Sequence, residues 1–126
     1  MLDNTLKIVV HLIYFKIVKN VKAVFMNYYK GLYIGDTVNN HEHIIELLYK
    51  NIYTYNIYVI CVKKKIGSLL TIVKSKELFN PINNYAEYIV VGLANGRQEA
   101  IQLTQTIIFD YYSKTKNFDG FKESFY

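Results

Sequence analysis

Two stretches of the chain have the hydrophobic periodicity of amphipathic helices. After Asn39, apolar side chains recur at steps of one to four residues at Ile44, Ile45, Leu47, Leu48 and Ile52. From Arg97 on, a second stripe contains Ala100, Leu103, Thr104, Ile107, Ile108 and Tyr111. Asn39 with Glu42, and Asn95 with Gln98, have the three-residue spacing of a capping box. The pattern therefore predicts two helices that each bury one face.

Four other stretches are short apolar runs that are typical of β-strands. They span residues 26–36, 56–63, 68–74 and 87–93. The first run is interrupted at Gly31, which indicates a bulge, and it ends at Gly35-Asp36. The second and third runs are nearly continuous, so we expect interior strands, joined by a hairpin because the residues between them are polar and include a glycine. Pro81 and an Asn pair predict a loop over residues 77–85.

The order of these elements predicts the fold class. From residue 41 the chain runs helix, strand, strand, strand, helix, after one or two earlier strands. The economical arrangement is an α+β domain over residues 26–126, with a small, mostly antiparallel sheet of three to five strands covered by two helices. The polar tail after Ser113 carries Phe118, Phe121 and Phe125 at three- and four-residue steps, so we expect it to pack back on the domain.

Residues 1–25 form a basic, apolar segment ahead of that domain. The run Ile8–Phe15 is too short for a membrane-spanning helix, and Lys16, Lys19 and Lys22 interrupt the apolar residues after it. A leading positive region and a clean cleavage site, as in a signal peptide, are missing. The β-branched residues favour a strand, whereas the lysine spacing favours a basic amphipathic helix on a membrane or partner. Initiation at Met26 is a further alternative.

Composition places the chain among single-domain globular proteins. It has 126 residues, of which 52% are hydrophobic and 20% charged, with 13 Tyr and 7 Phe but no Trp. Most of the net charge of +5 lies in residues 1–25. The single cysteine, Cys61, lies in an apolar run and is predicted to be a buried structural thiol. A chain without a disulfide framework fits the cytoplasm, and we expect no transmembrane segment.

Several longer motifs carry a resemblance to other proteins. They are "YIG" near the start, "LLTIVKSKELFNP" in the middle, and "YIVVGLANGRQEAIQLTQTII" with "FDGF" toward the end. On these motifs the chain from about Met26, roughly four-fifths of its length, resembles a group of short uncharacterised proteins of clostridial genomes. The resemblance implies a bacterial protein and no particular activity. Residues 1–25 fall outside it, which favours initiation at Met26.

The junction before the second helix is a candidate binding site. Gly92 and Gly96 precede the helix, and free N–H groups at a helix start can hold a phosphate, here with Asn95, Gly96 and Arg97 as the contacts. The junction lacks the third glycine of a dinucleotide loop and the Lys-Ser/Thr of a P-loop. Asn95 and Gly96 also suit a plain turn and helix cap. We favour this structural interpretation.

Catalytic and metal sites find little support in the sequence. His41 and His43 are two residues apart at a helix start, so their side chains diverge and cannot chelate one metal. The serines lie in no nucleophile motif, and Glu42 and Glu46 share what is predicted to be a solvated helix face. We therefore expect neither an enzyme nor a bound metal or cofactor.

RNA binding is one of two functional hypotheses. The element order over residues 41–113 resembles that of a double-stranded-RNA-binding domain, which contacts phosphates from the start of its second helix and the minor groove from its first helix and a loop. The candidate contacts are Lys63, Lys64, Lys65 and Arg97. The lysine-rich cluster and the Gly-Pro-His loop of that family are missing here.

Self-association is the hypothesis that the composition favours. Tyr28, Tyr29 and Tyr33 lie on the first predicted strand, and the aromatic side chains together exceed what a core of this size can bury. Exposed aromatic surface is typical of protein interfaces. We therefore expect a small interaction domain that forms a homo-oligomer or binds a protein partner, with these three tyrosines as the candidate interface.

Overall fold

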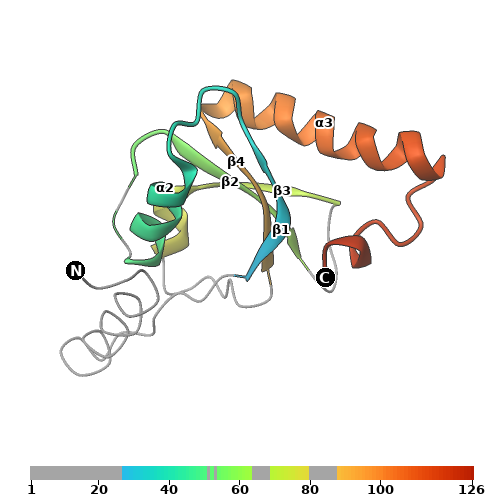
Figure 1. The fold of residues 1–126 in the computed structure, drawn as a ribbon, viewed down its shortest axis with the longest axis horizontal. Helices are drawn as coiled ribbons and strands as arrows, with labels where there is room; N and C mark the ends of the chain where they lie inside the picture. Colours follow the sequence, from blue (N-terminus) through green and yellow to red (C-terminus); the bar gives the residue numbers. More distant parts are fainter. Residues whose placement is uncertain (1–26, 51, 53, 64–68, 80–87) are drawn as a thin grey trace.

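The computed structural model describes residues 27–50, 52, 54–63, 69–79 and 88–126. Its elements are, in chain order, β1 (Asn27–Ile34), α2 (His41–Tyr49), β2 (Ile57–Lys63), β3 (Thr71–Lys74), the 3-10 helix η2 (Ser75–Phe79), β4 (Tyr88–Asn95), α3 (Arg97–Thr115) and the 3-10 helix η4 (Glu123–Phe125) (Figure 1). The predicted order of helix, three strands and helix is confirmed, with one strand ahead of it.

The four strands form one mixed sheet in the order β1-β4-β2-β3. β2 pairs antiparallel with β3 and with β4, whereas β1 pairs parallel with β4. The register between β1 and β4 shifts between Tyr28 and Tyr33, which places an irregularity around Gly31 as predicted. The fold is therefore α+β, with a mostly antiparallel sheet and two helices packed on it.

β2 and β4 are the central strands of this sheet. Every residue of β4 from Ile89 to Ala94 is buried, because both faces of the strand are covered. β3 pairs only with β2 among the described strands, and its residues alternate between half-buried and exposed. The prediction of an interior strand at 68–74 is wrong: Val73 packs into the core, but Ile72 points to the other face and stays exposed.

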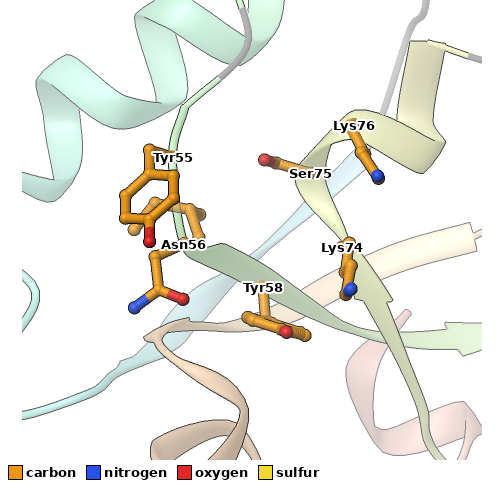
Figure 2. Close-up of a pocket in the computed structure, with 7 residues that line it drawn as sticks. Tyr55, Asn56, Tyr58, Lys74, Ser75 and Lys76 are labelled. Carbon is orange, nitrogen blue, oxygen red and sulfur yellow. The ribbon is translucent and has the colours of Figure 1, made fainter.

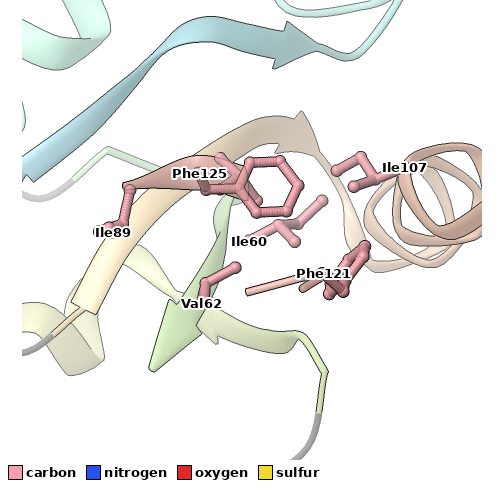
Figure 3. Close-up of a cluster of buried hydrophobic side chains, with 7 residues drawn as sticks. Ile60, Val62, Ile89, Ile107, Phe121 and Phe125 are labelled. Carbon is pink, nitrogen blue, oxygen red and sulfur yellow. The ribbon is translucent and has the colours of Figure 1, made fainter. Parts of the chain in front are cut away.

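The two helices cover opposite faces of the sheet. Neighbouring side chains in a strand point to opposite faces, so each central strand supplies both sides. On the α2 side the buried cluster contains Leu48, Val59, Cys61, Leu78, Val90 and Leu93. On the α3 side it contains Ile60, Val62, Ile89, Val91, Ile107, Phe121 and Phe125 (Figure 3). The domain therefore has three layers, with the sheet in the middle.

β4 contains a bulge beside Gly92, the residue that packs tightly under α3. Ile60 of β2 pairs with Gly92, but the next residue, Cys61, pairs with Val90, so β4 contains one extra residue here. A Cβ on Gly92 would lie 3.2 Å from Ile60 Cδ1 and 3.2 Å from Leu103 Cδ2. Tight packing under α3 is therefore a sufficient reason for glycine at this position.

The C-terminal tail packs back on the α3-side face, as the spacing of its phenylalanines predicts. Phe121 and Phe125 are buried, with ring centroids 5.2 Å apart, and Phe125 meets Tyr29 of β1 edge-on. The Tyr111 hydroxyl donates a hydrogen bond to the carbonyl of Asp119, which fastens the tail to α3. The third phenylalanine, Phe118, stays 41% exposed.

The start of α2 differs from the prediction by one residue. Asn40, and not Asn39, caps the helix: its φ is 53°, and its Oδ1 accepts a hydrogen bond from His43 N at 3.3 Å. Glu42 therefore does not occupy the third helical position that a capping box requires. Asparagine tolerates the left-handed backbone that this cap position adopts.

Some predictions concern residues outside the described ranges. They are the segment 1–25, the join between β2 and β3, and residues 80–85 of the predicted loop. The first residues of that loop, Glu77 to Phe79, belong to η2. Within the described part of the chain, no helix is both long enough and apolar enough to span a bilayer.

Candidate functional site

The β4–α3 junction is a turn that depends on glycine. Gly96 is the cap residue of α3, with φ 91° and ψ 153°, a region that only glycine adopts readily. Its N–H donates to the carbonyl of Asn56 at 2.8 Å. The prediction that Asn95 caps the helix is wrong, because Asn95 is the last residue of β4 and α3 has no side-chain cap. With the cap at Gly96, Gln98 also falls one position short of a capping box.

The carboxylate of Glu99, in the first turn of α3, holds this junction together. Its Oε1 accepts a hydrogen bond from Asn95 N at 2.9 Å. Its Oε2 accepts from Thr37 N at 3.1 Å and from Thr37 Oγ1 at 2.6 Å. A Cβ on Gly35 would collide with this carboxylate, so the glycine leaves the space for it. Glu99 thereby ties α3 to the loop that follows β1.

The charge of the Glu99 carboxylate also affects whether an anion can bind at the predicted anion site. Partial burial acts to raise the pKa of Glu99, but the hydrogen bonds from Asn95 and Thr37 outweigh it and lower the pKa. The ionised carboxylate sits at the positive end of the α3 dipole, where a bound phosphate would otherwise lie. These contacts support the structural interpretation of Asn95 and Gly96, while Arg97 points to solvent as an exposed residue.

The two predicted RNA contacts that the structure describes, Lys63 and Arg97, lie far apart. Lys63 ends β2, with its Nζ 5.9 Å from the centroid of the Tyr88 ring, and Lys64 and Lys65 lie outside the described residues. Ile57, at the other end of β2, is the residue that pairs with Asn95, next to Arg97. Six residues of strand, about 20 Å, therefore separate Lys63 from the Arg97 end. α2 and α3 lie on opposite faces of the sheet, an arrangement that does not favour contact of one duplex with both helices.

The three tyrosines of the predicted interface lie on β1 and are engaged within the domain. Tyr28 packs against the α2-side cluster, where burial and then unfavourable charge interactions with Cys61 and Tyr49 raise its pKa. Tyr29 packs on the α3 side against Phe125. Burial and a hydrogen bond to Asp110 Oδ2, 3.1 Å long, raise the pKa of Tyr33 to about 12. Each is half-buried, so these rings stabilise the fold and offer limited surface to a partner.

The outer side of α3 carries the larger aromatic surface. Phe109 is 70% exposed and Tyr112 43% exposed, one helical turn apart on the same side. The ring of Phe118, in the tail, lies 5.3 Å from that of Tyr112 at an angle of 31°. We call Phe109, Tyr112 and Phe118 the aromatic patch. The sequence signal that could have identified it is Phe109, an aromatic residue outside the apolar stripe of its helix.

The rest of that helix side is polar but uncharged. Between Arg97 and Lys114, the exposed residues of α3 are Gln98, Gln102, Gln105, Thr106, Phe109, Tyr112 and Ser113. We call these seven residues the outer face of α3. Protein interfaces are depleted of charge and enriched in aromatic residues at their centres, and the outer face of α3 has both properties.

Neither a reactive thiol nor a metal-binding cluster is found in the described part of the chain. Cys61 is fully buried, as predicted, and burial raises the pKa of its thiol to about 12, so the thiol stays protonated at neutral pH. The described residues contain no group of three His, Cys, Asp or Glu side chains that could hold a metal ion.

Comparisons of this chain with protein-family models, with curated proteins and with solved structures find no match. The geometry of the chain itself therefore carries the functional argument.

Proposed function

We propose that this protein is a small non-enzymatic interaction domain that self-associates through the outer face of α3. The observation that supports this proposal is the aromatic patch, where Phe109 leaves 70% of its surface in water and Tyr112 and Phe118 extend the same apolar area. Contiguous exposed aromatic surface of this kind is costly in water, and a partner that covers it gains the hydrophobic free energy.

A second copy of the chain suits this face because the face is uncharged. In a two-fold symmetric contact the same patch occurs on both sides, so a charge close to the two-fold axis meets its own copy in the partner. The whole chain carries a net charge of +5, so two copies repel each other at long range. The outer face of α3 has no charged residue, so two copies can approach each other there without like-charge repulsion within the contact.

The size of the contact predicts a reversible association. α3 has 19 residues and is therefore about 28 Å long. One helix side of that length buries less than the roughly 800 Å² per partner of a standard interface. We therefore expect a monomer and a dimer in exchange, with the dimer favoured at high concentration.

Sedimentation velocity over a concentration series tests this proposal. Phe109→Lys places a like charge at the centre of the two-fold contact, so this variant is expected to stay monomeric at concentrations where the wild type dimerises. Tyr55→Lys is the matched control, because Tyr55 is 84% exposed but lies outside α3. A wild type that stays monomeric at several hundred micromolar, or an equal loss of dimer in both variants, would contradict the proposal.

A further inference from the structure

A second candidate site lies where β2 begins and β3 ends. A pocket of about 140 Å³ opens there, and it contains no residue of α3. Its lining consists of Tyr55, Asn56, Ile57, Tyr58, Lys74, Ser75 and Lys76 (Figure 2). In Figure 2 the two lysines stand on one side and Tyr55 and Asn56 on the other.

Hydrogen bonds fix the walls of this pocket relative to each other. Tyr58 and Lys74 are paired residues of β2 and β3, so they share one face of the sheet. Ser75 Oγ donates to the carbonyl of Thr54 at 2.8 Å, which ties the start of η2 to the turn before β2. Asn56 Nδ2 donates to Asn95 Oδ1 at 2.9 Å. The pocket is therefore anchored by buried and cross-strand contacts.

The two lysines make the pocket a candidate for an anion. Both are exposed, and within the described ranges neither Lys74 nor Lys76 forms an ion pair. Both lysines line the pocket, so an anion bound there would interact favourably with two positive charges. Phosphate oxygens are suitable acceptors for lysine, which acts as a point charge.

The tyrosines add aromatic surface to the pocket, with Tyr55 on the side opposite the two lysines. Tyr55 is 84% exposed, although an aromatic ring in water is unfavourable, and Tyr58 is half-buried. A volume of about 140 Å³ holds roughly four to five waters and is below the range for an enclosed drug-sized ligand. The expected ligand therefore places a phosphate and one edge of a ring in the pocket and leaves the rest outside.

We propose that this pocket binds a nucleotide, with Lys74 and Lys76 contacting the phosphate and Tyr55 stacking on the base. The nucleotide is either free or part of a single strand, since both present a phosphate next to a flat base. This site is independent of self-association through α3, because the two surfaces share no residue.

Titrations of the full chain test this site with three probes. They are inorganic phosphate, a mononucleotide followed by chemical-shift changes, and a fluorescent oligouridine followed by anisotropy at several salt concentrations. Tyr55→Leu is expected to weaken binding of the oligonucleotide roughly five- to a hundredfold. Lys74→Ala and Lys76→Ala are each expected to reduce the slope of log affinity against log salt by about 0.7.

Lys114→Ala is the matched control, since Lys114 is also exposed but lies near the end of α3. Tighter binding of the oligonucleotide than of the mononucleotide would assign the site to single strands, and the reverse would assign it to free nucleotides; both support the proposal. Three results would overturn it: no binding of any probe at low salt, an unchanged affinity in Tyr55→Leu, or an equal effect of Lys114→Ala. Circular dichroism confirms that each variant is folded.

Discussion

At the scale of single residues, Glu99 is the side chain that most strongly determines the local structure of the candidate site. It accepts hydrogen bonds from two segments, one 62 residues away at Thr37 and the other four residues away at Asn95. No local sequence pattern marks Glu99 for this role, because its contact with Thr37 joins distant parts of the chain. The local capping pattern favoured Asn95 instead, and the positive φ of Gly96 overrode it.

Replacement of Glu99 by glutamine tests this network through its pH dependence. A lowered pKa in the folded state means that the carboxylate stabilises the fold above its ordinary pKa of about 4.3, and that this stabilisation is lost as the pH falls through the folded-state value. Glu99→Gln is expected to reduce the free energy of unfolding by about 1–2 kcal/mol at pH 7, and by less at acidic pH.

Urea denaturation at pH 7 and pH 3 measures both values. Glu42→Gln is the control, because Glu42 is an exposed glutamate at the start of α2 without the Thr37 and Asn95 contacts. A difference between wild type and Glu99→Gln that stays constant with pH would show that the ionised carboxylate has no special role.

At the scale of elements, both ends of α3 have a residue with positive φ, but only one of the two residues is a glycine. Gly96 begins the helix with φ 91°, and Lys116 ends it with φ 63° in the left-handed region that disfavours lysine. Helix positions were predictable from the sequence, since an apolar stripe is a local property. Cap residues were less predictable: Asn40 and Gly96 are set by backbone angles, and each lies one residue from the predicted asparagine.

Substitutions at these two ends are expected to change the free energy of unfolding in opposite directions. Gly96→Ala should lower the free energy of unfolding by about 1–3 kcal/mol, because alanine is strained at this φ and ψ. Lys116→Gly should raise it by about 0.5–1 kcal/mol, because glycine adopts the left-handed conformation without strain. Chemical denaturation of the two variants beside the wild type measures both changes. A neutral Gly96→Ala would contradict the assigned turn geometry.

At the scale of the whole molecule, the sequence predicted the class of the fold but not the order of its sheet. β2, within the run 56–63, is an interior strand as predicted, and β4 is interior as well, although the sequence favoured the run 68–74 for that place. No local sequence pattern specifies that β1 pairs parallel with β4, or that α2 and α3 pack on opposite faces of the sheet. The same limit applies to the candidate interface, since the half-buried β1 tyrosines pack against the two core clusters while Phe109 stays 70% exposed.

Self-association through α3 is tested most directly by distances between spin labels on two copies. Cys61 is fully buried, so a label can be attached to a single new cysteine. Gln102→Cys labels the outer face of α3, and Glu42→Cys labels α2 on the opposite side of the sheet. Intermolecular distances below about 30 Å, the length of α3, are expected for the label at position 102, with longer distances at position 42. Adding Phe109→Lys to either labelled protein should abolish the intermolecular dipolar coupling. Shorter distances between α2 labels than between α3 labels, or no dipolar coupling at high concentration, would contradict self-association through this face.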